Sequence, residues 1–194
     1  MIINEILTPL VNESSGYSLK GSFTHDLIKS KVWLLTELAR IAPDVGTIYV
    51  LGSWYGNLGV LLALDPVIQY RQLINVETDP EFLQASERIH DRLGMGNTEY
   101  MLKDANDLDY QQLGKDGVVV NTSLTDMPGQ AWFNNIPAGT LVVMQSRDND
   151  PGNAAHSTQD IIDRYPLSKI IYDGELKLQD PETEYTRYMV IGIK

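Results

Sequence analysis

Apolar residues along the chain follow two spacings, a helical period in some stretches and short continuous runs in others. The helical spacing predicts a long helix that begins at Thr24, a suitable N-cap, and stops before Pro43. Its expected buried face includes Leu27, Val32 and Leu35. Seven short β-type runs follow, and further helical stretches separate the first six of them. These runs cover residues 48–51, 72–76, 98–103, 117–121, 139–145, 168–178 and 184–194.

Alternation of strands and helices predicts an α/β fold, with a mostly parallel sheet covered by helices on both sides. The turn-forming stretch 179–183 separates the last two runs, so these should form an antiparallel hairpin at the C-terminus. We expect one compact unit, with an N-terminal arm and covering helix over 1–44 and the main domain over 45–194. The Ser- and Gly-rich stretch 12–21 is expected to be a loop or lid.

The region 47–79 is the centre of the predicted site. A strand there leads into a turn with glycines at Gly52, Gly56 and Gly59, and a second strand ends on Glu77. The glycines let a ligand approach the backbone, and the start of the following helix offers unpaired N–H groups. A carboxylate at the end of the second strand can accept hydrogen bonds from two ribose hydroxyls.

The composition narrows the possible functions. The chain has 194 residues, a formal net charge of −11 and no cysteine. The acidic balance disfavours binding to duplex DNA, and the lack of cysteine excludes disulfides and cysteine-ligated metals. The three histidines show no metal-ligand spacing, so no metal is expected. His90 lies on a helix face and is expected to be exposed to solvent. The start of the chain does not read as a signal peptide and no stretch is long and apolar enough for a membrane span, so we expect a cytoplasmic protein.

Four segments resemble motifs of the class I S-adenosylmethionine-dependent methyltransferases, a family with a seven-stranded Rossmann-like, doubly wound sheet. The glycine-rich first motif is similar to 52–58 (GSWYGNL) and the acidic second motif to 76–80 (VETDP). Asp104 and Ala105 lie where the third motif is expected, and 121–123 (NTS) where the fourth is. More narrowly, GSWYG, NTS and VVMQS resemble poorly characterised methyltransferases, some of them phage-encoded.

The resemblance implies S-adenosylmethionine as cofactor and methyl transfer as reaction, with residues 45–194 as the cofactor-binding domain. Glu77 would bind the ribose, Asp104 the adenine, and backbone N–H groups after Gly52 the methionine carboxylate. The implied cofactor-binding residues are Gly52, Ser53, Trp54, Tyr55, Gly56, Glu77, Thr78, Asp104, Ala105, Asn121 and Thr122. The residues expected near the transferred methyl group are Asn121, Ser123, Asp126 and His156, the last as a general base.

The sequence departs from the family pattern in three places. Val50 replaces an acidic residue that often precedes the first glycine, and Trp54 replaces the middle glycine. The fourth motif lacks the Asp/Asn-Pro-Pro-aromatic pattern linked to methylation of nucleic-acid bases, which argues against DNA as substrate. A small molecule or an exposed protein or RNA group remains as acceptor.

Two other functions stay open, an NAD-dependent oxidoreductase and a non-catalytic nucleotide-binding or S-adenosylmethionine-binding protein. Asn121, Thr122 and Ser123 could instead serve only the backbone of a turn. Tyr165 and Lys169 match the Tyr-x-x-x-Lys spacing of short-chain dehydrogenases, but Pro166 disfavours the single helix which that site needs. The sequence does not indicate an oligomeric state.

Overall fold

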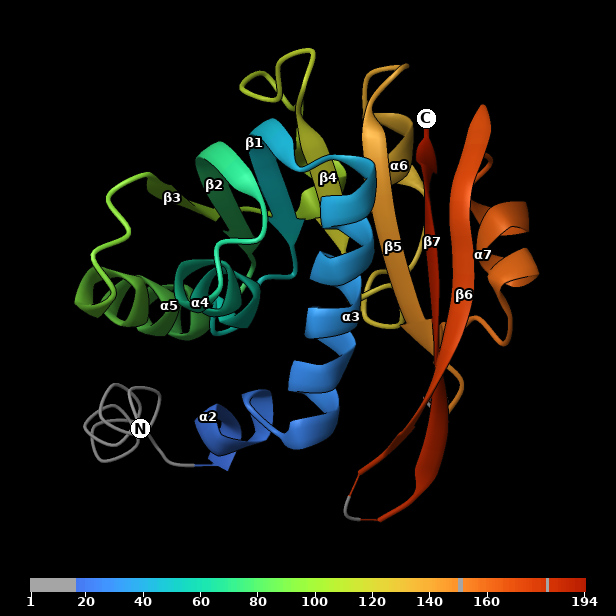
Figure 1. The fold of residues 1–194 in the computed structure, drawn as a ribbon, viewed down its shortest axis with the longest axis horizontal. Helices are drawn as coiled ribbons and strands as arrows, with labels where there is room; N and C mark the ends of the chain where they lie inside the picture. Colours follow the sequence, from blue (N-terminus) through green and yellow to red (C-terminus); the bar gives the residue numbers. More distant parts are fainter. Residues whose placement is uncertain (1–16, 150–151, 181) are drawn as a thin grey trace.

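A computed structural model describes residues 17–149, 152–180 and 182–194. Seven strands form one sheet in the order β3-β2-β1-β4-β5-β7-β6 (Figure 1). The first five pair in parallel, and β7 runs antiparallel to β5 and β6. The strands are β1 (Asp44–Leu51), β2 (Gln69–Glu77), β3 (Thr98–Leu102), β4 (Val118–Asn121), β5 (Leu141–Arg147), β6 (Lys169–Gln179) and β7 (Glu184–Ile193). The predicted mostly parallel sheet with a terminal hairpin is therefore confirmed.

The helices match the predicted ones except near the N-terminus. They are α2 (Tyr17–Ser22), α3 (His25–Ile41), α4 (Asn57–Leu64), α5 (Pro80–Arg92), α6 (Ala131–Asn134), α7 (Thr158–Arg164) and the 3₁₀ turn η1 (Ala105–Asp107). The loop predicted for 12–21 is wrong for residues 17–21, which lie in α2, while 12–16 fall outside the described residues. In the described ranges, no helix is long and apolar enough to cross a membrane.

The helices cover both faces of the sheet, as Figure 1 shows, with α3, α4 and α5 on one side and α6 and α7 on the other. On the first face Leu34 and Leu38 of α3 pack with Leu62 of α4 against Ile48 and Val120 of the sheet. These side chains are at most 1% exposed. Their burial fixes α3 against this face of the sheet.

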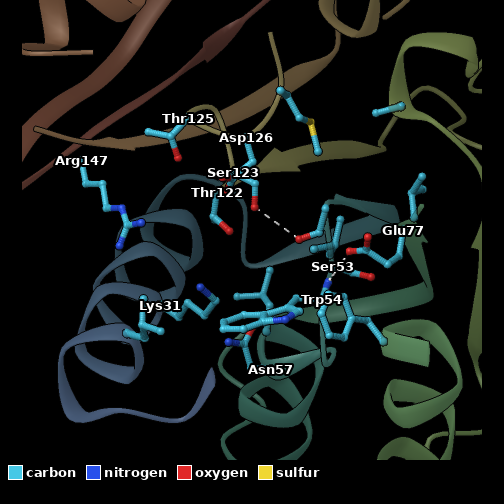
Figure 2. A pocket seen from close by; sticks show the side chains of 18 of the residues that line it. Lys31, Ser53, Trp54, Asn57, Glu77, Thr122, Ser123, Thr125, Asp126 and Arg147 are labelled. Carbon is cyan, nitrogen blue, oxygen red and sulfur yellow. Dashed lines mark hydrogen bonds between the residues drawn. The ribbon is translucent and has the colours of Figure 1, made fainter. Parts of the chain in front are cut away.

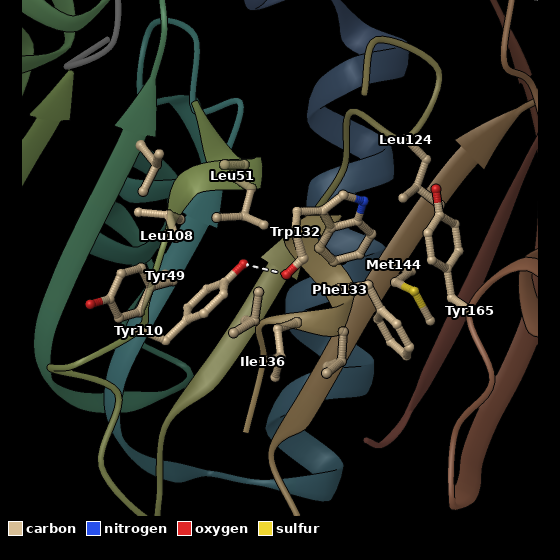
Figure 3. Close-up of a cluster of buried hydrophobic side chains, with 14 of the residues drawn as sticks. Tyr49, Leu51, Leu108, Tyr110, Leu124, Trp132, Phe133, Ile136, Met144 and Tyr165 are labelled. Atoms are coloured by element: carbon tan, nitrogen blue, oxygen red, sulfur yellow. Dashed lines mark hydrogen bonds between the residues drawn. The ribbon is translucent and has the colours of Figure 1, made fainter. Parts of the chain in front are cut away.

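The second face carries an aromatic cluster around Trp132 and Phe133 (Figure 3). Both are fully buried, and the Tyr110 hydroxyl donates a 3.0 Å hydrogen bond to the Trp132 carbonyl. Tyr165 packs on both rings, with centroids 5.1 and 5.4 Å away. Tyr165 is the C-cap of α7, whereas Lys169 begins β6. The two residues with the spacing of a short-chain dehydrogenase site therefore do not share a helix.

His90 fixes the glycine-rich turn that follows β1. Its side chain is fully buried, so a solvated histidine, the expectation from its place on a helix face, is wrong. The ring Nε2 lies 2.8 Å from the Gly56 carbonyl oxygen and Nδ1 lies 3.1 Å from the Tyr100 hydroxyl. Burial lowers the pKa of His90, which favours the neutral ring. Helix α5 is thereby tied to the start of α4.

Replacing Gly56 tests how tightly this turn is packed. Gly56 has φ +68°, and a Cβ there would lie 2.2 Å from Ser86 Oγ and 2.6 Å from the His90 ring. We expect Gly56→Ala to lower the free energy of unfolding by about 1–3 kcal/mol or more, measured by urea denaturation. Gly96→Ala is the matched control, because a Cβ at Gly96 meets open space. Equal stability of the two variants would show that the turn is not so constrained.

Candidate functional site

A cavity of about 790 Å³ lies beyond the carboxyl ends of β1, β2 and β4, where parallel sheets bind ligands (Figure 2). Its walls come from the turn after β1, the end of β2, the loops after β3 and β4, helix α3 and the ends of β5 and β7. Ten of the predicted site residues line it. They are Gly52, Ser53, Trp54, Glu77, Thr78, Asp104, Ala105, Thr122, Ser123 and Asp126.

Glu77 is held by backbone N–H groups from both sides of the crevice. Its Oε2 accepts a 2.8 Å hydrogen bond from the N–H of Trp54, and its Oε1 accepts bonds of 2.8 and 3.2 Å from Thr78 and Asp79. A carboxylate has about four acceptor positions, so Oε2 retains capacity for a ligand hydroxyl. Asp79 caps α5 by accepting from the Glu81 N–H, and Glu77 lines the cavity.

Trp54 adopts the left-handed conformation that its position requires. Its φ is +53°, one of two positive values among the described non-glycine residues. Such a conformation costs a bulky residue of order 1–3 kcal/mol, and the bond to Glu77 helps to hold it. The indole packs on Tyr55 and Phe82, with ring centroids 5.4 and 6.1 Å away. Trp54 therefore forms part of the wall and leaves the cavity open.

The residue after β3 shapes another side of the cavity. Asp104 Oδ1 accepts a 2.8 Å bond from the Asn106 N–H and a 3.0 Å bond from the Asn106 side-chain amide. These bonds cap η1 and use only Oδ1 of the carboxylate, and Asp104, Ala105 and Asn106 all line the cavity. A carboxylate there can accept from an amine of a planar ligand.

The loop after β4 has one structural residue and several that reach the cavity. Asn121 is fully buried, and its side chain accepts from the Ser123 N–H at 2.9 Å and donates to Met127 Sδ at 3.2 Å. Asn121 thus serves the turn, the alternative left open above. Ser123 lines the cavity and its hydroxyl donates a 3.3 Å bond to the Gly52 carbonyl, drawn in Figure 2. That bond joins the ends of β4 and β1.

Four predicted site residues do not line the cavity: Tyr55, Gly56, Asn121 and His156. Tyr55 and Gly56 support the turn from behind, where Tyr55 packs 5.0 Å from the Phe82 ring centroid. His156 is exposed beside the start of α7, and its backbone N–H donates to Asp160 at 3.0 Å. The structure therefore does not bring His156 together with Ser123 and Asp126.

The arrangement of the strands can be compared with known structures. An rRNA methylase from Streptococcus thermophilus superposes with a TM-score of 0.58 at 15% identity, over 89% of this chain and 99% of that one. The YcgJ protein from Bacillus subtilis gives 0.61 at 10% identity, over 86% and 98%. An RNA methyltransferase from Salinibacter ruber, solved with S-adenosyl-L-homocysteine, gives 0.50 at 20% identity, over 84% and 90%. No protein-family model and no curated protein sequence matches this chain.

The chain has the class I methyltransferase fold. Within this fold, Trp54 occupies the turn position at which the family resemblance placed a glycine, and its positive φ gives the physical reason for that glycine. The narrower resemblance to phage-encoded methyltransferases stays a prediction.

Sequence reasoning missed the four cations that line the cavity of this methyltransferase fold. They are Lys31, Lys103, Arg147 and Arg187. Lys31 is only 7% exposed, whereas Val32, expected in the buried face of α3, is 48% exposed. The prediction for Val32 is therefore wrong. The sequence did hold a signal that Lys31 faces inward. This lysine lies four residues after Leu27 and four before Leu35, in the apolar stripe of the helix.

Burial perturbs the charged groups at this end of the cavity. Desolvation, with Arg187 nearby, lowers the pKa of Lys31 to about 7, while Asp26 opposes the shift. Desolvation also lowers the pKa of Arg187 to about 10. Burial alone would raise the pKa of Asp26, but hydrogen bonds from Thr24, Tyr185 and the backbone lower it overall. The Tyr185 hydroxyl donates a 2.6 Å bond to that carboxylate.

We predict that Lys31→Met stabilises the protein below neutral pH. The folded pKa of Lys31 lies below its unfolded value of about 10.4, so holding the charged form in the folded state costs stability at low pH. At pH 6 the variant should gain roughly 1–4 kcal/mol in free energy of unfolding. Between about pH 7 and pH 10 the unfolded wild type binds more protons than the folded one, so the stability of the wild type rises with pH. The advantage of the variant should therefore fade over this range.

Thermal unfolding between pH 6 and pH 10 measures this effect. Lys29→Met is the control, because Lys29 is exposed on the same helix and its loss should change stability little at any pH. A Lys31→Met variant that is less stable than wild type at pH 6 would mean that the ammonium is well compensated in the folded protein.

Proposed function

We propose that this chain is an S-adenosylmethionine-dependent methyltransferase. The observation that carries the proposal is the cavity at the ends of β1, β2 and β4, into which the backbone-held Glu77 carboxylate faces. The fold and its neighbours support it, since neighbours were solved with S-adenosylhomocysteine bound.

The residues present fit this cofactor in size and chemistry. The volume of about 790 Å³ lies within the range of small-molecule pockets. The Ser53 hydroxyl lines the cavity, is buried and has no hydrogen-bond partner in the described part of the chain, so a polar ligand group would satisfy it. A Cβ at Gly52 would lie 2.8 Å from Met127 and 3.0 Å from Ser123, so glycine is needed where the turn passes under the loop after β4.

Each part of the wall then has a role. Glu77 would accept the ribose hydroxyls, Asp104 with Ala105 would face the adenine, and Ser53 with the adjacent backbone would hold the methionine part. When bound, S-adenosylmethionine supplies an electrophilic methyl group on a sulfonium. Thr122, Ser123 and Asp126 line the cavity beside this turn and would contact and orient the acceptor. The role of His156 as general base stays a prediction.

The sheet topology is less favourable to a dinucleotide enzyme. A dinucleotide-binding sheet of the common type has the strand order 3-2-1-4-5-6, whereas here β7 is inserted antiparallel between β5 and β6. The acceptor is a small molecule or an exposed protein or RNA group, because the net charge of −11 opposes binding to a duplex.

Replacing Glu77 tests the cofactor site. We predict that Glu77→Gln weakens S-adenosylhomocysteine binding at least about tenfold in calorimetry, because a hydrogen bond to a charged acceptor is lost or weakened. The amide keeps one acceptor oxygen and the side-chain size. Glu77→Ala should weaken binding further, since the Trp54 N–H also loses its partner.

Asp79→Ala is the matched control for Glu77. Asp79 lies two residues away and caps α5 through the Glu81 N–H, so its loss should cost about 1 kcal/mol of stability but leave the affinity unchanged. Absence of S-adenosylhomocysteine binding to the wild type at millimolar ligand would refute the proposed function. Binding without methyl transfer to any acceptor would favour a non-catalytic binding protein.

A further inference from the structure

The end of the cavity away from Glu77 is cationic. Lys31 comes from α3, Arg147 from the end of β5 and Arg187 from β7, so three elements distant in sequence converge there. Figure 2 shows Lys31 and Arg147 on one side of the cavity, near Thr122, with Glu77 on the opposite side. Lys31 and Arg147 therefore lie opposite Glu77 in one cavity.

Two of these cations are buried and have N–H groups that donate no hydrogen bond within the described residues. Lys31 and Arg187 are 7% and 5% exposed. Lys31 has no hydrogen-bond or ion-pair partner among the residues that the structure describes. Arg187 donates from Nη2 to the Thr122 carbonyl at 2.6 Å, but its buried Nε–H has no partner within the described ranges. The Arg187 Nε–H is thus a buried charged donor without an acceptor, which is costly and points to an acceptor supplied by a ligand.

The protein's own carboxylates compensate this end only in part, although Asp26 and Asp126 both act on Arg187. Asp26 is the one buried carboxylate in the described residues, and it accepts the Tyr185 hydroxyl. Asp126 and Glu182 are exposed at the rim, and Asp180 accepts the N–H groups of Glu182 and Thr183 at 2.8 Å. When Lys31 is protonated, two buried cations face one buried carboxylate, and an anionic ligand would compensate the remaining positive charge.

We propose that Lys31 and Arg187 bind an anionic group, a carboxylate or a phosphate, carried by the methyl acceptor. The inference rests on the proposed function, which assigns the Glu77 end to the cofactor. The Lys31 ammonium and the Arg187 Nε–H would donate to oxygens of the anion, and Thr122 would hold the guanidinium in place. An uncharged oxygen could also accept these hydrogen bonds, but bonds between a cation and an anion are about twice as strong as those between neutral groups, so the site favours the anion.

Anion binding should take up protons near neutral pH. The groups that act on Lys31 are Arg187 from β7 and Asp26 from its own helix, and with its pKa at about 7 it is mostly neutral at pH 8. An anion beside it favours the charged form and raises that pKa, so the complex binds a fraction of a proton more than the free protein. Affinity for the anion should therefore fall as pH rises above 7.

The test uses the full chain saturated with S-adenosylhomocysteine, titrated by calorimetry with benzoate, phenyl phosphate and, as a neutral control, benzyl alcohol. Titrations in Tris and in triethanolamine measure the proton uptake, because the two buffers differ in ionisation enthalpy. Both are cations when protonated, so neither competes with the anion. We expect either anion to bind with proton uptake at pH 8 and the alcohol not to bind measurably. The tighter of the two anions shows whether the site suits a carboxylate or a phosphate.

Variants assign the binding to the two cations. Lys31→Met should weaken anion binding about tenfold or more and abolish the proton uptake, while S-adenosylhomocysteine affinity stays within about threefold. Arg187→Lys, which keeps the charge but removes the Nε–H, should weaken anion binding several-fold. Lys115→Met is the control, because Lys115 is an exposed lysine before β4, at the opposite end of the sheet.

Three outcomes would overturn the inference. Binding of S-adenosylhomocysteine without binding of either anion would refute it and leave the proposed function standing. An equal loss of S-adenosylhomocysteine binding in Lys31→Met would mean that these cations hold the carboxylate of the cofactor. If S-adenosylhomocysteine itself does not bind, the proposed function fails, and equally weak anion binding by the ligand-free chain and by its Lys31→Met variant would then overturn the anion site as well.

Discussion

The hydrogen bond from the Trp54 N–H to the Glu77 carboxylate is the interaction on which the site depends. It joins the turn after β1 to the end of β2, and it holds a bulky residue at a positive φ that a glycine would adopt freely. Because the same carboxylate also accepts from Thr78 and Asp79, its position is fixed before any ligand arrives. The cavity wall is thus preorganised by backbone donors rather than by flexible side chains.

The sequence predicted the fold well because its apolar runs carry the period of each element. All seven strands and the cover of helices were predicted, and most of the glycine turn and Glu77 lie where the motifs placed them. The errors came from contacts distant in sequence. Lys31 rather than Val32 faces inward because that side of α3 lines the cavity together with Thr122 and Arg187. His90 is buried because its ring forms hydrogen bonds with the Gly56 carbonyl and the Tyr100 hydroxyl. Local spacing holds no information on such neighbours.

The cavity combines two electrostatic environments within an acidic protein of net charge −11. Glu77 and Asp104 provide acceptors at one end, while Lys31 and Arg187 provide buried donors at the other. Burial of those donors costs stability, and retaining them is the pattern of a functional site rather than of a core. The division suits a two-substrate reaction, in which the fold brings two ligands of different charge into contact.

A crystal structure of the protein with S-adenosylhomocysteine tests the central claim most directly. The account predicts the ribose hydroxyls within hydrogen-bonding distance of the Glu77 carboxylate, with Trp54 still at positive φ and the Lys31 end of the cavity left for a second ligand. A ligand bound elsewhere, a Glu77 carboxylate turned away from the ribose, or a Trp54 indole occupying the adenosine position would contradict it.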